Sequence, residues 1–347
     1  MDVSRLFVSL CCAWFWAACG ASEKEVRPAG SDPFGGQMAA AGAGNQVEGG
    51  GEVADGVPGG SDAAPSLESG RYVFRLGEVE LEVDPAVGGR VTRFSLAGSN
   101  ILTGPDVVAG GDGSLPNMYG STFWTSPQSD WGWPPEVAID SAAHEVVLEG
   151  PVLKLVSEPG ATTGYAVQKR FSTDTERGKV VLEYALINQA ATLPAAPWEI
   201  SRVPKEGLVF FAAASPALAQ SSLASQLLDG VAWIDIAQAP AEDSKLFQDG
   251  SEGWLAYVYR DLVFIKVFDD IAPAEQATGE AEIEIFINGT FGYVEIEQQG
   301  PYSLPPVGGS SVWRVGWLLR RLPAEGRASV GNAALVSWVR DQVRRAR

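Results

Sequence analysis

Short runs of alternating or β-branched residues recur along residues 71–347, and this pattern limits the folds open to the chain more than any other feature. Turn-forming residues bound the runs, and the spacing between them is too short for the helices that connect parallel strands. We therefore expect an all-β domain of antiparallel sheets packed face to face. The expected strands are residues 72–76, 79–83, 90–96, 145–148, 152–157, 165–171, 179–187, 208–211, 231–236, 254–259, 262–268, 281–287, 293–297 and 312–319.

Three local patterns add to this outline. Asn288-Gly289 separates two of the expected strands and predicts a hairpin, because this dipeptide adopts the left-handed turn conformations that tight hairpins need. Residues 329–345 predict one long helix, with apolar residues on one side and arginines near its end, packed against the outside of a sheet. Residues 217–228 predict either a second helix or a loop over the functional site.

The first 18 residues are expected to be a signal peptide. The apolar run 6–18 is shorter than the roughly 20 residues that span a bilayer as a helix, and small residues precede Cys19 as at a cleavage site. The segment resembles a bacterial lipobox, which implies that Cys19 carries a lipid anchor. The alternative is an ordinary signal peptide with a chance cysteine at its end.

Residues 19–70 are rich in Gly, Ala, Ser and acids, so we expect them to form a disordered tether. Residues 71–347 are expected to fold as one domain, monomeric and held at the bacterial cell envelope by the lipid anchor alone. Gly20 after the cysteine favours the outer membrane.

Charge and cysteine usage exclude several functions. The formal net charge of −18 argues against nucleic acid and anionic membrane surfaces, because both require a basic face. If Cys11 and Cys12 leave with the signal peptide, the folded domain has no thiol for a disulfide or a zinc site. We expect no metal and no cofactor, since no metal-binding or phosphate-binding motif is present.

Residues 120–136 resemble a sugar-binding site in composition. Trp124, Trp131 and Trp133 stand among polar residues that include Gln128 and Asp130. A pyranose has one face of C–H groups and a rim of hydroxyls, so its receptor needs flat apolar plates beside donors and acceptors. Prolines exclude a regular helix here, and a loop is expected. The alternative is that the indoles close the end of a β core.

Three segments, read in order, resemble galactose mutarotase-like proteins, the superfamily of the aldose 1-epimerases. Residues 84–94 contain a Gly-Gly-Arg-Val opening, the Trp-rich segment follows, and residues 293–302 contain Glu-x-Gln. The closest resemblance is to an uncharacterised branch of that superfamily, over residues 71–323. It implies a β-supersandwich fold, here followed by the C-terminal helix.

The resemblance implies that Glu297 is the base of a mutarotation reaction, which needs a base at the anomeric hydroxyl and an acid at the ring oxygen. In the family the acid is a His on a mid-chain strand, and the corresponding region here has none. His144, the single His of the chain, matches no family motif and is expected to be exposed at a strand end. Glu199 or Tyr165 would then serve as the acid.

Charged residues complete the expected site. Arg90 and Arg202 would grip a carboxylate or sulfate on an acidic sugar, or else form salt bridges to the abundant acids. Glu295 and Glu297 lie two apart on one strand and therefore face the same side, either as an acid/base pair in a pocket or as solvent-exposed charge. The residues expected to bind the ligand are Arg90, Trp124, Gln128, Asp130, Trp131, Trp133, Trp198, Arg202, Glu295 and Gln299.

The sequence therefore predicts an envelope lipoprotein with a carbohydrate-binding domain that need not turn its ligand over. The first alternative is a sugar isomerase or glycan-active enzyme that uses Glu297 as base with an acid other than His. The second is a structural lipoprotein, which would bind no sugar at all.

Overall fold

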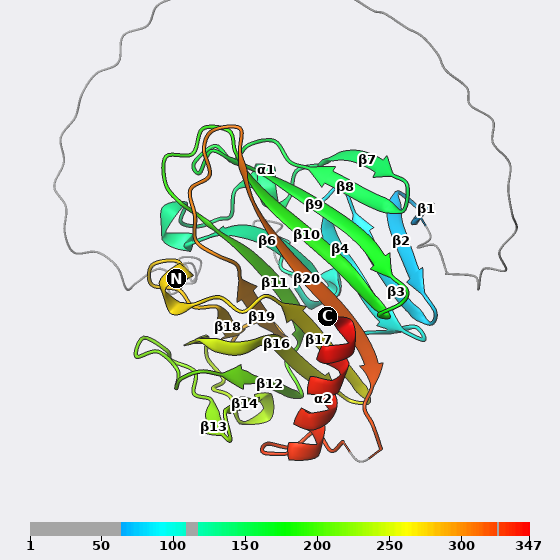
Figure 1. Ribbon diagram of the computed structural model, residues 1–347, viewed down its shortest axis with the longest axis vertical. Coiled ribbons are helices and arrows are strands. Elements are labelled where there is room, and N and C mark those ends of the chain that lie inside the picture. The colour runs from blue at the N-terminus through cyan, green and yellow to red at the C-terminus, as the bar shows by residue number, and fades with distance from the viewer. Residues whose placement is uncertain (1–63, 109–116, 325) are drawn as a thin grey trace, which may run out of the picture. The chain divides into compact units, whose positions relative to one another are not determined.

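The computed structural model describes residues 64–108, 117–324 and 326–347 (Figure 1). The described residues all belong to one compact unit, residues 57–347. The expected signal peptide, the lipid-carrying Cys19 and most of the expected tether lie outside the described residues. The ordered sheet begins at Ser66, five residues before the expected start of the domain at residue 71, because Ser66–Glu68 pairs with the next strand.

Two antiparallel sheets make up the domain, as the strand pattern predicts. The first sheet runs in the order β1 (Ser66–Glu68), β2 (Arg71–Leu76), β3 (Val79–Asp84), β4 (Arg90–Leu96), β6 (Ser121–Ser126), β11 (Ala196–Pro204), β19 (Tyr293–Gln299), β18 (Ile283–Ile287) and β15 (Ser244–Gln248), with β5 (Ser99–Asn100) beside β4. The second runs in the order β13 (Gln226–Leu228), β14 (Val231–Asp235), β12 (Leu208–Ala213), β16 (Gly250–Tyr259), β17 (Leu262–Phe268), β20 (Ser310–Arg321), β10 (Lys179–Asn188), β9 (Tyr165–Asp174), β8 (Val152–Val156) and β7 (Glu145–Glu149).

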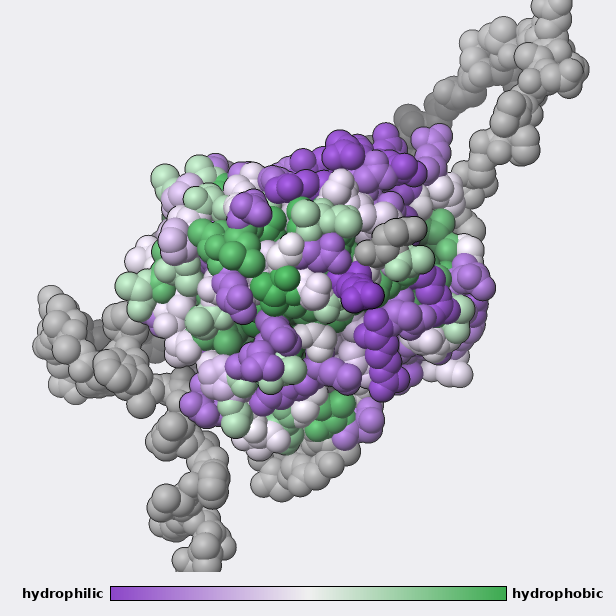
Figure 2. Space-filling view, turned by 90° about the horizontal axis from the view of Figure 1, so that it is seen from below, coloured by the Kyte–Doolittle hydropathy of each residue, from purple (hydrophilic) through white to green (hydrophobic). Residues whose placement is uncertain are grey.

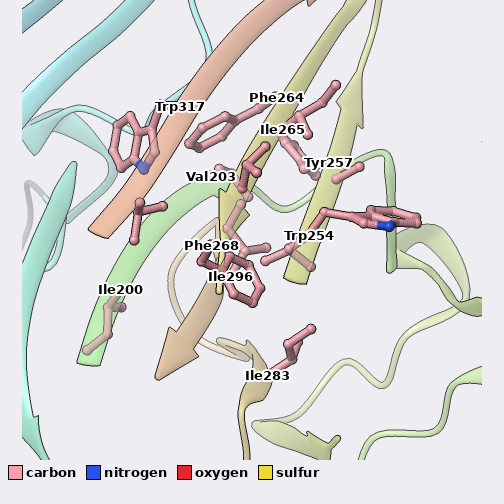
Figure 3. Packing of buried hydrophobic residues seen from close by; sticks show 14 of the residues in the cluster. Ile200, Val203, Trp254, Tyr257, Phe264, Ile265, Phe268, Ile283, Ile296 and Trp317 are labelled. Atoms are coloured by element: carbon pink, nitrogen blue, oxygen red, sulfur yellow. The ribbon is translucent and has the colours of Figure 1, made fainter. Parts of the chain in front are cut away.

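The core lies between the two sheets. Phe94 of the first sheet meets Phe264 and Trp317 of the second, with ring centroids 5.3 and 5.2 Å apart. Phe123 of the first sheet stacks on Tyr184 of the second at 4.2 Å. Aromatic pairs of this kind add to the apolar area that packing buries. Figure 3 shows part of this layer, with Phe264 and Trp317 side by side.

Helices are few among the described residues. Short 3-10 helices cover Pro105–Val108, Gln128–Asp130, Ile236–Gln238 and Pro273–Glu275, and α1 (Val137–Asp140) is a single turn. The expected C-terminal helix is α2 (Ala333–Ala346), and it begins where the Asn332 side chain accepts hydrogen bonds from the N–H groups of Ala334 and Leu335. It packs against β17 and its neighbours on the side of the second sheet away from the first (Figure 1).

The predicted hairpin is present, since β18 and β19 pair across residues 288–292. Residues 217–228 form no helix. They make a loop along the edge of β15, where Leu218 N–H donates to Phe247 O and Ser222 N–H to Lys245 O, and end in β13. The Trp-rich segment is only partly a loop, because its first residues form β6 between β4 and β11. Trp124 is therefore a strand residue.

Figure 2 views the end of the domain near β13 and shows polar residues over most of that face, with apolar residues in small groups. Leu227 and Leu228 of β13 are among the exposed apolar residues. No helix in the described part of the chain is long and apolar enough to cross a membrane.

Candidate functional site

Strand register brings most of the expected site residues onto one surface, the outer face of the first sheet, which is turned away from the second sheet. Trp198 lies between Trp124 of β6 and Gln299 of β19, and Glu297 lies two residues before Gln299 on the same strand. Arg202 lies opposite Glu295. Because side chains alternate along a strand, all of these project from the same face. These side chains are almost completely buried.

A lysine and two carboxylates form the centre of this face. Lys245 of β15 places Nζ 2.6 Å from Glu284 Oε2 and 3.3 Å from Glu297 Oε2. Trp198 Nε1 donates to Glu297 Oε2 at 2.8 Å, and Lys245 Nζ lies 4.9 Å from the centre of the Trp198 ring. Gln299 Nε2 donates to Glu284 Oε1 at 2.6 Å. Lys245 and Glu284 are site residues that the sequence analysis missed.

Burial is the largest influence on the pKa values of the ionisable groups in this cluster. It raises the pKa of Glu297, and the nearby carboxylates raise it further, although Lys245 opposes them. Burial lowers the pKa of Lys245, but Glu284 and Glu297 more than offset it, so the ammonium is retained at neutral pH. Burial and the charge of Glu284 also raise the pKa of Glu280. The cluster thus contains more carboxyl groups than cations.

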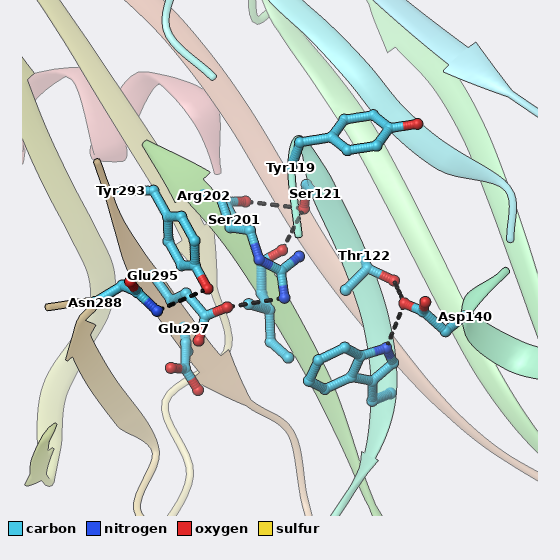
Figure 4. Close-up of polar contacts among 12 residues, drawn as sticks. Tyr119, Ser121, Thr122, Asp140, Ser201, Arg202, Asn288, Tyr293, Glu295 and Glu297 are labelled. Atoms are coloured by element: carbon cyan, nitrogen blue, oxygen red, sulfur yellow. Dashed lines mark hydrogen bonds and ion pairs between the residues drawn. The ribbon is translucent and has the colours of Figure 1, made fainter. Parts of the chain in front are cut away.

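Arg202 is the second charged centre of the outer face (Figure 4). Its Nη2 lies 2.8 Å from Glu295 Oε1, and its guanidinium carbon lies 5.5 Å from the Trp124 ring and 5.9 Å from the Tyr293 ring. The side chain is fully buried, yet Nε and Nη1 find no hydrogen-bond partner among the described residues. Buried guanidinium nitrogens are normally hydrogen-bonded, so these two atoms are exceptions to the usual pattern.

Arg90 and Trp124 meet at a residue that sequence reasoning did not identify, Asp140 of α1. Asp140 Oδ1 accepts from Arg90 Nη2 at 2.8 Å and from Trp124 Nε1 at 2.9 Å. It also accepts from Thr122 Oγ1 at 3.3 Å (Figure 4). Arg90 Nη1 also donates to Tyr119 O at 2.9 Å. Arg90 therefore forms a salt bridge within the protein and does not have its two terminal nitrogens free for an acidic sugar.

The indoles form one connected group. Trp124 contacts Trp131, Trp133 and Trp198 edge to face, at 5.6, 6.4 and 5.7 Å between ring centres. Trp131 Nε1 donates to Thr125 O, which fixes that ring, whereas Trp133 is 42% exposed. A small hollow beside this group is lined by Trp124, Thr125, Trp131, Pro135, Glu136 and Ile139.

Gln128 and Asp130 lie beside the indoles on the 3-10 helix that follows β6, and both are partly exposed. Burial raises the pKa of Asp130. They lie in the segment that follows β6 and not on the sheet.

Glu199 lies on the opposite side of the first sheet from Glu297. Its Oε1 accepts from Trp317 Nε1 at 3.0 Å and is 3.0 Å from Lys266 Nζ, and both partners belong to the second sheet. Gln298 also donates to it. Glu199 is therefore a residue of the core between the sheets, and it cannot act on a ligand that Glu297 touches.

The other acids considered from the sequence also lie away from the outer face. Tyr165 lies on β9 of the second sheet, where its hydroxyl donates to Leu193 O. The expectation that His144 is exposed is wrong: its side chain is buried near Gly89 and Lys169. Burial, reinforced by the Lys169 charge, lowers its pKa to about 3, so the ring is neutral. No group of His, Cys, Asp and Glu residues in the described ranges is arranged to hold a metal ion.

Comparison with known proteins gives structural matches only. No family model and no curated protein sequence matches the chain. The crystal structure of the Slr1438 protein from Synechocystis sp. PCC 6803 has 15% identity and a TM-score of 0.54, and the match covers 74% of this chain and 97% of that one. At this identity the likeness shows a shared fold.

Structures described as mutarotase-like are also among the matches. A candidate aldose 1-epimerase from Escherichia coli K12 has 14% identity and a TM-score of 0.48, with 73% of this chain and 99% of that one covered. A galactose mutarotase-like protein from Clostridium acetobutylicum has 11% identity and a TM-score of 0.46, with 72% and 95% covered.

Proposed function

We propose that the domain binds a carbohydrate on the outer face of the first sheet and does not turn it over. The observation that carries this proposal is the pairing of indole rings with buried polar atoms that lack partners among the described residues. Trp124 and Trp198 supply apolar plates, and Arg202 supplies free N–H groups. Free acceptors are Glu297 Oε1 and Gln299 Oε1.

These groups match the chemistry of a sugar. Ring hydroxyls both donate and accept, so they can satisfy guanidinium nitrogens and carboxyl oxygens at the same time, while the C–H face of the ring packs on an indole. An unpartnered buried polar atom costs about 1–3 kcal/mol, so filling such positions with hydroxyls would favour binding.

Turnover is disfavoured by the protonation of the cluster. The raised pKa of Glu297 keeps its proton at neutral pH, where a base must be ionised. The cations beside it, Lys245 and Arg202, have raised pKa values and release protons reluctantly. Glu199 faces the core and His144 is neutral, so neither provides the missing acid.

A sugar isomerase is the second candidate, and one observation favours it. Glu280 has a raised pKa and lies near Glu284 and Lys245, so a protonated carboxyl stands near Glu297 and could serve as an acid. Proton exchange at the anomeric carbon separates the two functions. With a panel of aldoses, binding by calorimetry without faster anomeric exchange by NMR supports a binding domain, and exchange that the protein accelerates supports an isomerase.

We further propose that the domain is tethered to the bacterial envelope through a lipid on Cys19, and that the outer membrane holds it. The apolar run before Cys19 and the Gly-rich segment after it support this arrangement. A structural lipoprotein remains the competing function, and the absence of any saturable sugar binding would favour it.

A further inference from the structure

We infer that the site prefers a sugar with a free ammonium group, and that the Lys245 ammonium occupies the position of that group in the ligand-free protein. The inference rests on the proposed carbohydrate binding and specifies the class of sugar. Three observations carry it: the position of Lys245, the balance of charge around it, and the acceptors beside it.

Lys245 covers two buried carboxyl groups of the outer face. Its ammonium lies between Glu284 and Glu297 and over the face of Trp198. The Lys245 side chain is 23% exposed, whereas the side chains of Glu284 and Glu297 are fully buried. Its strand, β15, is the last of the first sheet. A ligand group that takes the position between Glu284 and Glu297 must therefore displace the Lys245 ammonium.

The arginines of the outer face already have carboxylate partners. The position that Lys245 fills is surrounded by carboxyl groups, so it suits a cation and not an anion. Arg90 is matched by Asp140 and Arg202 by Glu295. Lys245 alone faces Glu284, Glu297 and the nearby Glu280. An acidic sugar that took the place of Lys245 would put an anion beside the buried Glu284 carboxylate, so this cluster argues against the acidic ligand considered for the arginines.

A neutral sugar in the position of the Lys245 ammonium would not supply the positive charge that the ammonium supplies. Moving the ammonium away would leave the buried Glu284 carboxylate without its cation, and an uncompensated buried charge is strongly unfavourable. An ammonium on the ligand restores the ion pair with Glu284 and the contact with Glu297. Its three N–H donors also reach toward acceptors such as Glu297 Oε1 and Gln299 Oε1, which lack partners among the described residues. The Trp198 ring stabilises a cation over its face.

The test compares three ligands that share one ring: a hexosamine, its N-acetyl derivative and the parent hexose. Calorimetric titration of the unmodified protein at pH 6.5 should show the hexosamine binding at least about tenfold more tightly than the other two. At pH 9.5 this preference should disappear, because an amine like an α-amino group, with a pKa of about 8, has then lost its charge.

A variant tests the role of Lys245 directly. In Lys245→Met the hexosamine should bind more tightly than in the parent, because no resident ammonium competes, while hexose affinity should not rise. Lys154→Met is the matched control, since Lys154 is 24% exposed and paired with Glu149 on the second sheet. It should leave all three affinities unchanged.

The outcomes separate the two proposals. If the hexose or the N-acetyl derivative binds as tightly as the hexosamine at pH 6.5, the amino-sugar inference is overturned and carbohydrate binding stands. If none of the three binds and a wider sugar panel also fails, carbohydrate binding itself is wrong. The ligand and pH comparisons use the unmodified protein, so they decide the matter even if Lys245→Met does not fold.

Discussion

At the scale of single residues, Glu297 is a buried carboxyl group with one oxygen satisfied and one free. Trp198 and Lys245 contact Oε2, while Oε1 has no hydrogen-bond partner in the described part of the chain. A residue selected for stability would have both oxygens paired, because each unpaired buried acceptor costs free energy. A residue selected for binding can keep one oxygen for its ligand, since stability is often lower at functional sites.

We predict that Glu297→Gln lowers sugar affinity at least about tenfold, equivalent to about 1.4 kcal/mol, and leaves the melting temperature unchanged or raised. The amide oxygen still accepts from Trp198 Nε1, and a buried ionisable group is removed. Calorimetric titration beside thermal melts measures both effects. Glu199→Gln is the control: it should lower the melting temperature, because Lys266 loses its ion pair, without changing affinity. A Glu297→Gln protein that melts early and binds normally would make Glu297 structural.

We predict that the His144 ring does not titrate near its ordinary pKa. Burial, with the Lys169 charge, lowers that pKa to about 3 in the folded state against about 6.5 in an unfolded chain. Because the unfolded chain then binds the proton first, stability should fall as pH drops below about 6.5, by up to about 1.4 kcal/mol per pH unit. The chain has one His, so its NMR signal is unambiguous.

The imidazole resonance should stay constant from pH 8 to pH 4.5. His144→Gln should weaken the loss of stability between pH 6.5 and pH 5, where few carboxylates titrate. A midpoint near pH 6.5 in the folded protein would mean that the ring is hydrated and the burial is wrong.

The sequence predicted correctly which residues share a face when they lie on the same strand, because side chains alternate along a strand. It placed Glu295, Glu297 and Gln299 on one side of β19 without any structure. It could not relate that side to Glu199, because the face that a residue on another strand presents depends on register, which only pairing fixes. Lys245 was missed for the same reason, since a lone Lys in a polar segment gives no sign of its partners.

At the scale of elements, the turn between β3 and β4 decides how the outer face is assembled. Gly88 has a φ of +65°, and its N–H donates to Ala142 O beyond α1. A Cβ at this position would lie 1.9 Å from Asp140 O. The turn thus packs directly on α1 and holds Asp140 where Arg90 and Trp124 bind it.

We predict that Gly88→Ala destabilises the protein by several kcal/mol, because the backbone of α1 must move. Gly98→Ala is the matched control: Gly98 also has positive φ, at +81°, but nothing lies within 4 Å of a Cβ there. The control should cost only the roughly 1–2 kcal/mol of a left-handed Ala. Denaturant unfolding of both variants measures the difference, and equal losses would show that the packing of the turn on α1 is unimportant.

The element-level prediction from sequence was good wherever one face of a strand is apolar. Every expected strand overlaps an observed one. The strands that were missed include β6, β11 and β15, whose polar residues are buried on one or both faces. In β11, Glu199 forms an ion pair on the core side of the sheet and Arg202 forms one on the outer side. Both faces of the strand are buried, so its sequence does not show the alternation of apolar and polar residues that predicts a strand.

At the scale of the whole molecule, residues 57–347 form a compact unit by their own contacts. For the N-terminal segment we propose attachment to the envelope through Cys19, with the segment up to residue 70 as a tether.

We predict that Cys19→Ser releases the protein from the membrane fraction and abolishes fatty-acid labelling. The thioether to the lipid requires the sulfur, so the hydroxyl cannot replace it. Labelling with an alkyne fatty acid and fractionation provide the readout. Cys12→Ser, within the apolar run, is the control and should label like the parent. If both variants label and fractionate alike, the cell does not use Cys19 as an anchor.

The two faces of β11 and β19 should also differ in how substitutions on them affect folding and ligand binding. Successive residues of these strands alternate between the inter-sheet core and the outer face. In a saturation-mutagenesis library sorted once for folded protein and once for ligand capture, tolerance to substitution should alternate along both strands. The positions of Glu199 and Gln298 should be depleted in the first sort, whereas those of Trp198 and Glu297 should be depleted mainly in the second.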